Sequence, residues 1–509
     1  MTAVDFLPLL VALPLLAAVL PVLVARVRSG IVRPLTLAAL AAQVGLAAWV
    51  AWRVASDGTL TTALGAIPAG FGIGLAVDRL SAVLVVLVAV VGLGAFALAD
   101  ARTTAPEASL WLLLVAGFTG VAVTADVFNL YVFLEISGLA AYALVASGRG
   151  VDAALAAFKY LLVGTVGATL YLLGVGYAFV ATGTLSMTDL APGLAAAGYE
   201  STLVVAAYGL MAVGLGVKVA LFPLHTWKPD AYAAAPGAVA VALGALGSTV
   251  AGYALVRITY GVFTVDFLAA VPEIQALLVA AGAVSVAAGG VLALRATDVR
   301  RLLAYSSVSQ FGLFAVGLAL ANPVALTGAL VTLVGHAVAK GGLFAVTVAV
   351  EARTGARTVG EYARLAIGFP VAAAVVGVLA ASLVGLPPTV GFAGKFYLAL
   401  GAVDAGAWLP AAVVVASTLL SLGYAGRLVE RAYLAPATAG DALATDGGTP
   451  ADRGETSEAG VDEAGAGFDD GRATRALAFA VGAAALVLAL GVGAGALADW
   501  FAPVVEGWL

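Results

Sequence analysis

Apolar stretches long enough to cross a lipid bilayer recur along almost the whole of this 509-residue chain. A helix needs about 20 apolar residues to cross about 30 Å of hydrocarbon, and we expect about fourteen such spans. Because 63% of the residues are hydrophobic and only 10% are charged, we predict an all-α polytopic membrane protein. The expected spans are approximately 6–25, 32–52, 79–99, 108–125, 127–147, 154–181, 201–222, 235–260, 273–294, 301–321, 325–350, 367–402 with a break, 408–430 and 476–498.

The composition also excludes several kinds of site. The chain has no Cys, so it offers no thiol nucleophile, disulfide or cysteine-ligated iron–sulfur cluster. Its two His residues, His225 and His336, are too few for a histidine-based metal or haem site. Gly72-Ile73-Gly74 lies in a loop between spans and does not indicate nucleotide binding. We expect no cofactor, no metal and no nucleic-acid partner.

Basic residues are distributed unequally between alternate loops. With both chain ends outside, seventeen of the 24 Lys and Arg residues fall in inner loops, Lys228 among them. Only Arg53, Arg79 and Arg257 fall in outer loops. Cytoplasmic loops carry the excess of basic residues. We therefore expect a multi-pass protein of the cell membrane in this orientation.

Residues 435–475 differ in composition from the rest of the chain. They are rich in Ala, Gly, Thr and acidic residues and have almost no large apolar side chains. Such a segment cannot bury enough apolar surface to fold by itself. We predict a disordered acidic linker on the cytoplasmic side.

Lysines are concentrated inside the membrane. Of five lysines, Lys159, Lys218, Lys340 and Lys395 lie within or at the edge of expected spans. Placing an ammonium in hydrocarbon costs roughly 2.5–3.5 kcal/mol on insertion scales, so such residues indicate function. Unlike arginine, a buried lysine can take up and lose a proton. The alternative for Lys218 is a side chain that extends to the interface from a helix end.

Two of these lysines accompany proline-broken spans. Lys218 precedes Pro223 and His225, and Pro387-Pro388 precede Lys395. Proline removes a backbone hydrogen bond, and a broken membrane helix is tolerated only where protein or water satisfies the freed groups. Two such breaks in the two halves of one chain point to internal repeats around an ion path at the membrane midplane.

One carboxylate and one histidine belong with these lysines. Glu135 lies about two turns inside the span that follows Asp126, where it must be neutral, paired or hydrated. Lys218 is its natural partner, either in ion transfer or in a static ion pair. His336 and Lys340 are four residues apart and share a helix face, which indicates the lining of a polar channel.

Five ordered motifs resemble the antiporter-like proton-conducting membrane subunits. They are residues 126–135, 218–231, 300–310, His336 with Lys340, and 385–395. This group includes subunits of Mrp-type multisubunit cation/proton antiporters, of respiratory complex I and of membrane-bound hydrogenases. The Phe-Asn-Leu sequence before the carboxylate in the first motif is most similar to the D-type subunit of the Mrp antiporters.

The resemblance implies a fourteen-helix fold with two inverted five-helix repeats, broken helices 7 and 12, and a central polar axis. It implies that Glu135 and Lys218 form the ion pair of the first half-channel, that His336 and Lys340 lie along the axis, and that Lys395 ends the second. The expected organisation is 1–77 (two helices and an outer loop), 78–232 (first repeat), 233–403 (second repeat), 404–434 (helix 13), 435–475 (linker) and 476–509 (C-terminal helix).

The chain departs from the family pattern in the eighth span. Where the family commonly has Lys or His four residues before a Tyr, this chain has Thr249 before Tyr253. A hydroxyl can order water but cannot hold a proton charge at neutral pH. The central relay is therefore interrupted here, or is carried by water and His225. Lys159 and Asp126 complete the set of accessory positions, with Thr249 and Tyr253.

Three functions follow as hypotheses. The first is a proton-translocating subunit of a Na⁺/proton antiporter, a transporter subunit and not an enzyme, assembled with other membrane subunits. The second is the corresponding subunit of a respiratory NADH or ferredoxin:quinone oxidoreductase or of a membrane-bound hydrogenase. The third is a scaffold subunit whose channel does not conduct.

Overall fold

The computed structural model describes residues 6–64, 73–434 and 470–509, and these are mostly helical. Twelve helices in these ranges are long and apolar enough to cross a membrane. Two further apolar elements, Leu9–Ala25 and Pro370–Val384, are shorter. They account for the remaining expected spans, so the polytopic all-α fold is confirmed.

The helices of the described ranges are, in chain order, α1 (Leu9–Ala17), α2 (Leu20–Ala25), α3 (Val32–Asp57), α4 (Arg79–Ala97), α5 (Ala105–Val123), α6 (Val127–Ala146), α7 (Val151–Thr182), α8 (Met187–Ala197), α9 (Thr202–Val219), α10 (Lys228–Ala234), α11 (Gly237–Ala242), α12 (Ser248–Val256), α13 (Thr264–Ala270), α14 (Pro272–Arg295), α15 (Val299–Ala319), α16 (Pro323–Thr354), α17 (Leu365–Gly368), α18 (Pro370–Val384), α19 (Val390–Asp404), α20 (Trp408–Tyr433), α21 (Asp470–Val492) and α22 (Ala494–Glu506). Two π-helical segments, Leu243–Gly247 and Arg257–Phe263, join α11, α12 and α13 into one long helix. Short 3₁₀ turns are Ser29–Ile31 and Gly360–Tyr362.

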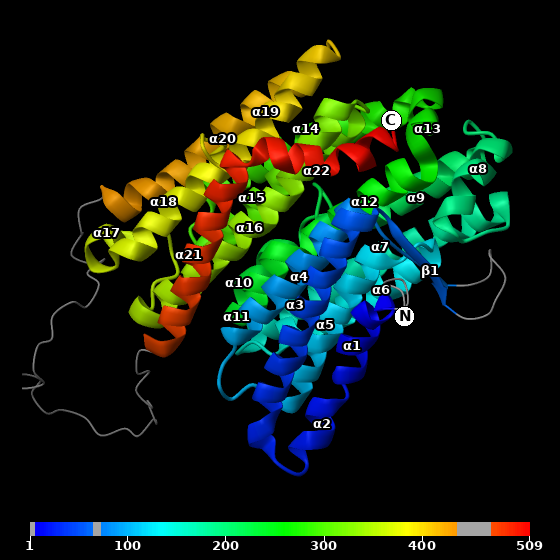
Figure 1. The fold of residues 1–509 in the computed structure, drawn as a ribbon. Coiled ribbons are helices and arrows are strands. Elements are labelled where there is room, and N and C mark those ends of the chain that lie inside the picture. Colours follow the sequence, from blue (N-terminus) through cyan, green and yellow to red (C-terminus); the bar gives the residue numbers. More distant parts are fainter. Residues whose placement is uncertain (1–5, 65–72, 435–469) are drawn as a thin grey trace, which may run out of the picture.

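The core of the molecule is formed by three elements: the helix Gly237–Ala270, α15 and α16. Nearly all of their residues are buried, whereas fewer than half of the residues of α7 and α14 are. Figure 1 shows the helices of the first half of the chain grouped on one side and α14–α20 on the other. Helix α21 packs along α16, and α22 contacts both α16 and α4. The C-terminal helices thus join the two halves.

The expected outer loop between α3 and α4 contains a hairpin that the sequence pattern did not predict. Strands β1 (Leu60–Leu64) and β2 (Ile73–Val77) pair antiparallel, with Leu60 opposite Val77. The Ala125 amide donates to the Gly74 carbonyl at 2.9 Å. The hairpin is therefore attached to the turn that begins α6.

Both expected helix breaks are present. Helix α9 ends at Val219 and is followed by Ala220 in the left-handed region (φ 70°) before the chain resumes as α10. Helix α18 ends at Val384, followed by Gly385 (φ 88°), and resumes as α19. The carbonyls at these helix ends lack intrahelical partners. Side chains of the candidate site satisfy several of them.

The structure contains an internal repeat. Asp126 caps α6 and forms an isolated backbone bridge with Ser186, while Asp298 caps α15 and bridges to Thr358. Asp298 follows Asp126 by 172 residues, as Thr358 follows Ser186. The second helix of each unit, α7 or α16, has 32 residues and ends at a Thr-Gly pair with the glycine left-handed.

Five membrane crossings separate the two caps: α6, α7, the α9–α10 pair, Gly237–Ala270 and α14. An odd number places the second unit in the opposite orientation, as in inverted repeats. The expected repeat boundaries were 78–232 and 233–403. We propose instead that the repeats run from α5 to α13 and from α14 to α20, about one helix later.

One expected boundary near the C-terminus is wrong. The linker was predicted to reach residue 475, but α21 begins at Asp470. An acidic residue in the first turn is favourable at the positive end of the helix dipole. The rest of the predicted linker, 435–469, lies outside the described residues. The span predicted at 476–498 ends at Val492, and α22 follows as a separate helix.

Candidate functional site

The ion pair expected between Glu135 and Lys218 is present. Lys218 Nζ, from the end of α9, donates to Glu135 Oε1 on α6 at 2.8 Å and to Tyr142 Oη at 3.2 Å. The Lys218 and Glu135 side chains are 10% and 19% exposed. Asp126 does not join the pair, because its side chain caps α6 by accepting from the Asn129 amide at 2.7 Å. Its part is to fix the start of the helix that carries Glu135.

A cluster of aromatic residues lies beside this ion pair, on the side of α7. Tyr142 packs edge-on against Tyr160 at 4.5 Å between ring centroids, and Tyr160 stacks on Trp227 at 4.0 Å. Trp227 Nε1 donates to the Val217 carbonyl at 3.0 Å, within the last turn of α9. This aromatic cluster therefore also provides a hydrogen bond to a carbonyl near the helix break.

His225 lies within the break between α9 and α10. Its ring stacks on Phe222 at 5.3 Å and lies 6.1 Å from the ring of Tyr305 on α15. The side chain is buried, and its Nδ1 has no hydrogen-bond partner among the described residues. It thus faces α15.

His336 and Lys340 lie on α16 and are both buried. Lys340 Nζ donates to the Leu303 carbonyl at 2.7 Å and to Ser306 Oγ, both on α15. His336 packs edge-on against Phe311 at 4.7 Å. Neither nitrogen of the His336 ring has a hydrogen-bond partner in the described part of the chain.

Lys395 lies on α19 against the broken end of α18. Its ammonium donates to the carbonyls of Leu383 and Val384 at 3.2 and 3.0 Å, and to Ser421 Oγ at 3.1 Å. A cation at a helix C-terminus is favourable because the unpaired carbonyls carry partial negative charge. The Lys395 ammonium therefore stabilises the open carbonyls at the break in this helix.

A polar connection runs from Lys340 to Lys395. Ser306, the partner of Lys340, lies one turn before Gln310 on α15. Gln310 Nε2 donates to the Leu383 carbonyl at 3.4 Å, the same carbonyl that accepts from Lys395. The second half thus contains a series of polar groups between Lys340 and Lys395, with one helical turn separating Ser306 from Gln310.

Thr249 and Tyr253 do not join this series. Thr249 Oγ1 donates to the Ala245 carbonyl of its own helix at 2.7 Å. Tyr253 Oη contacts Ser81 Oγ and the Ala122 carbonyl, both at 2.8 Å, and accepts from Arg257 Nε at 2.9 Å. Tyr253 therefore belongs to a separate cluster near the start of α4.

Arg257, predicted in an outer loop, is a half-buried member of that cluster and pairs with Asp78 at 2.5 Å. Burial tends to raise the pKa of Asp78, but the Arg257 guanidinium and the Ser81 amide outweigh it and hold this pKa below its usual range. The sequence pattern did not predict the pair because Asp78, which caps α4, is far from Arg257 in sequence, and contacts between distant elements leave no local pattern.

Lys159 lies at the rim of an open cavity. It pairs with Asp230 at 2.8 Å, and Arg301 pairs with the other oxygen of Asp230 at 2.8 Å. The cavity has a volume of about 1140 Å³ and is lined by many charged side chains, Arg149, Arg300 and Glu351 among them. Lys159 is thus part of the charged lining of this cavity and does not belong to the buried lysines.

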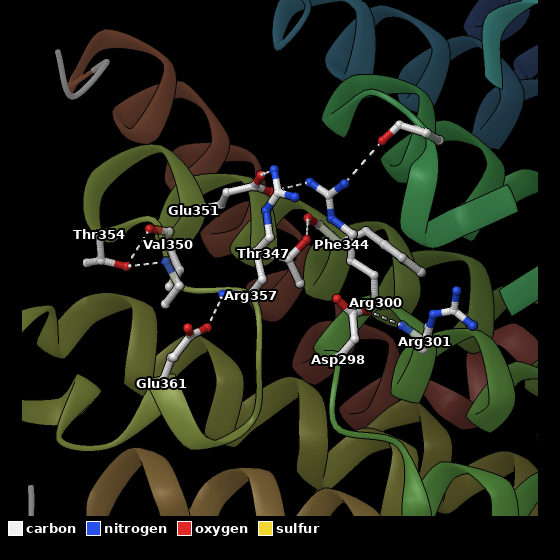
Figure 2. A network of polar contacts seen from close by, with 12 residues as sticks. Asp298, Arg300, Arg301, Phe344, Thr347, Val350, Glu351, Thr354, Arg357 and Glu361 are labelled. Atoms are coloured by element: carbon white, nitrogen blue, oxygen red, sulfur yellow. Dashed lines mark hydrogen bonds and ion pairs between the residues drawn. The ribbon is translucent and has the colours of Figure 1, made fainter. Parts of the chain in front are cut away.

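A second charged network borders this cavity. Arg300 Nη2 donates to Glu351 Oε2 at 2.6 Å, and Arg357 pairs with the other carboxylate oxygen of Glu351 (Figure 2). Glu361 accepts from the backbone amides of Thr358 and Arg357 at 2.8 Å each, which holds its pKa below its usual range. Glu351 was not among the predicted site residues because it lies just past the expected span 325–350.

Lys228 was counted above among the basic residues of the inner loops, and this assignment is wrong. It begins α10 and is 1% exposed, with its Nζ donating to Ser248 Oγ. The sequence did not indicate that Lys228 is buried, because Pro229 and Asp230 follow it and such residues are typical of a polar loop. The other inner-loop assignments do not depend on it.

Comparison with known proteins identifies the family of this chain. The family described as NADH:quinone oxidoreductase/Mrp antiporter, transmembrane, matches residues 124–421, which include every buried lysine named above. The chain belongs to this family. The predicted resemblance is thereby confirmed.

The relatives include subunits of NADH-quinone oxidoreductases and subunits of Na⁺/H⁺ antiporters. The N-type subunit of the NADH-quinone oxidoreductase of Desulforudis audaxviator is 45% identical over 377 residues, which cover 72% of this chain and 74% of the relative. The D-type subunit of the Na⁺/H⁺ antiporter of Bacillus subtilis is 30% identical over 423 residues, covering 82% and 85%. A chain in the Mrp complex from Dietzia sp. superimposes with a TM-score of 0.85 at 28% identity, covering 100% of this chain and 98% of that one.

Proposed function

We propose that this chain is the proton-translocating membrane subunit of a multisubunit cation/proton antiporter, with Na⁺ as the exchanged cation. The observation that carries the proposal is the ion pair between Glu135 and Lys218, largely buried between α6 and α9. Intramembrane ionisable groups are costly and mark ion pathways. Relatives named as D-type subunits of Na⁺/H⁺ antiporters support this assignment.

Protons would pass through the first half by way of Glu135 and Lys218 and through the second by way of His336, Lys340 and Lys395. The coupling is electrostatic. When Glu135 and Lys218 separate, the ammonium is no longer neutralised and repels a proton on the next group along the membrane. Because interacting groups titrate together, a change at one end is passed to the other. Lys159 and the cavity beside it would supply hydrated access.

The partners we propose are other membrane subunits, as expected for a chain similar to one in a multisubunit Mrp complex. The proposed location is the cell membrane, with the acidic segment 435–469 in the cytoplasm. The acidic character of that segment suits a hydrated compartment.

The test is proton flux in vesicles that contain the whole complex, driven by a Na⁺ gradient. Lys218→Ala is expected to abolish flux while the complex still assembles, because it leaves Glu135 without its partner. Unchanged flux in an assembled Lys218→Ala complex would favour the scaffold hypothesis and contradict the proposal.

The second candidate is a proton-pumping subunit of a respiratory oxidoreductase, which the 45% identity to an N-type subunit favours. Such a subunit would use the same proton route, but electron transfer would drive the proton movement. In the same vesicles, flux that requires an electron donor and is indifferent to Na⁺ would support this candidate and exclude the antiporter.

A further inference from the structure

The buried polar groups leave a gap between the two halves. Lys218 lies at the end of α9, whereas His336 and Lys340 lie on α16. Thr249 does not fill the gap, since its hydroxyl donates to its own helix. A proton passing between the halves needs a group there that can hold it and release it.

Lys228 lies in this gap. Its side chain is completely buried, and the ion pairs of the described residues leave it without a carboxylate partner. A buried ion without a counter-ion is costly, and a merely structural role does not require one. The lysine is therefore a candidate for function that the proposed route has not used.

The contacts of Lys228 reach toward the first half. Its ammonium donates to Ser248 Oγ, and Ser248 in turn donates to the Val219 carbonyl at 2.8 Å. Val219 is the last residue of α9 and directly follows Lys218. One hydroxyl thus links Lys228 to the helix end that carries the ion pair.

Its other contacts reach toward the second half. The ammonium lies 5.5 Å from the centroid of the Phe311 ring, and Phe311 in turn contacts the His336 ring, 4.7 Å away. The Tyr232 ring lies 5.2 Å from the same ammonium. Aromatic faces stabilise a cation without neutralising it permanently, as a carboxylate would.

The two helix breaks support the same role. Each broken helix consists of two segments. In each, a buried lysine on the second segment interacts with a carbonyl at the C-terminal end of the first segment, directly or through a hydroxyl. Lys395 donates to Val384 directly, and Lys228 reaches Val219 through Ser248. Lys228 is thus the first-half counterpart of Lys395.

We propose that Lys228 is the central proton carrier of this chain, between Lys218 and His336. This proposal rests on the proposed function. In one cycle the amine of Lys228 takes a proton from the Lys218 side and becomes an ammonium. It then gives that proton to a ring nitrogen of His336, through water, and returns to the neutral amine.

The test is Na⁺-driven proton flux in vesicles with the whole complex, comparing three variants of one position. Lys228→Gln keeps a hydrogen-bond donor for Ser248 but carries no proton, and Lys228→Arg keeps a charge that is never released. Both are expected to lower flux by about 100-fold or more, the lower end of what one positioned proton-transfer group contributes. Lys228→His can still exchange a proton near neutral pH and is expected to restore part of the flux.

Controls separate the ways in which the proposal can fail. Arg26→Gln alters an exposed cation outside the site and is expected to leave flux unchanged. Normal flux in an assembled Lys228→Gln or Lys228→Arg complex would overturn the central role of Lys228, and loss in Gln with full flux in Arg would show that a fixed charge suffices. If Glu135→Gln also conducts normally, the proposed function itself fails. Should Lys228→Gln not assemble, the comparison of Lys228→Arg with Lys228→His decides the matter.

Discussion

The properties of Lys218 depend on residues that carry no charge. Its ammonium lies beside Gly138, where an added Cβ would be 3.1 Å from Nζ. Its second acceptor, the Tyr142 hydroxyl, fits only because residue 164 on α7 is glycine. Small residues thus determine where the largest polar side chains of the site can lie.

Gly164→Ala tests this packing. The new Cβ would lie 2.0 Å from Tyr142 Oη, so the phenol must move away from Lys218. We expect a loss of about 1–3 kcal/mol in stability from overpacking, together with reduced proton flux. The measurement is the midpoint of thermal unfolding of the purified protein, followed by flux in vesicles.

Gly176→Ala is the matched control on the same helix. A Cβ there meets nothing within 4 Å, and alanine is the better helix former by about 0.5–1 kcal/mol. This variant is expected to be as stable as the parent or more so. Equal behaviour of the two variants would show that Tyr142 is not held by Gly164.

At the scale of elements, the helix breaks bring backbone and side chains together. Prolines and glycines in the sequence predicted both breaks, and the lysines near them predicted that the breaks are polar. The sequence did not show how the open carbonyls are satisfied, because Ser248 and Gln310 come from other helices. Contacts between distant elements are not encoded in local patterns.

Gly385→Ala tests the second break. Its left-handed backbone disfavours a side chain by about 1–2 kcal/mol, and the Cβ would lie 2.8 Å from Lys395 Cδ. We expect lower stability and lower flux, because the lysine has to leave the end of α18. Thermal unfolding and vesicle flux measure the two effects.

Gly355→Ala separates strain from contact. Gly355 is also left-handed, with φ 74°, but a Cβ there has open space around it. It should therefore lose similar stability and keep its flux. A normal flux in Gly385→Ala as well would mean that the position of Lys395 is not critical.

At the scale of the whole molecule, the sequence predicted the number of spans, the two breaks and the pairing of Glu135 with Lys218. It succeeded because apolar length, proline and intramembrane charge are local signals. It placed Lys228 in a loop and missed the network around Glu351, because both lie at span ends, where a window of residues cannot separate buried from exposed charge. The internal repeat was expected from the two breaks, but its 172-residue offset became visible only through backbone bridges and caps.

The orientation of the chain can be tested with one residue, since the native sequence has no cysteine. Ser457→Cys places a single thiol in the acidic segment. A membrane-impermeant maleimide is expected to label it in inverted vesicles and not in intact cells. Labelling of intact cells would reverse the orientation drawn from the basic residues.

The central claim is that the Glu135 charge takes part in proton transfer. The most direct measurement is Na⁺-driven proton flux in vesicles with the whole complex, comparing Glu135→Gln with Glu200→Gln, an exposed carboxylate outside the site. We predict that Glu135→Gln assembles normally and loses flux, while Glu200→Gln keeps it. Normal flux in an assembled Glu135→Gln complex would contradict the account and leave the buried pair as a structural bond.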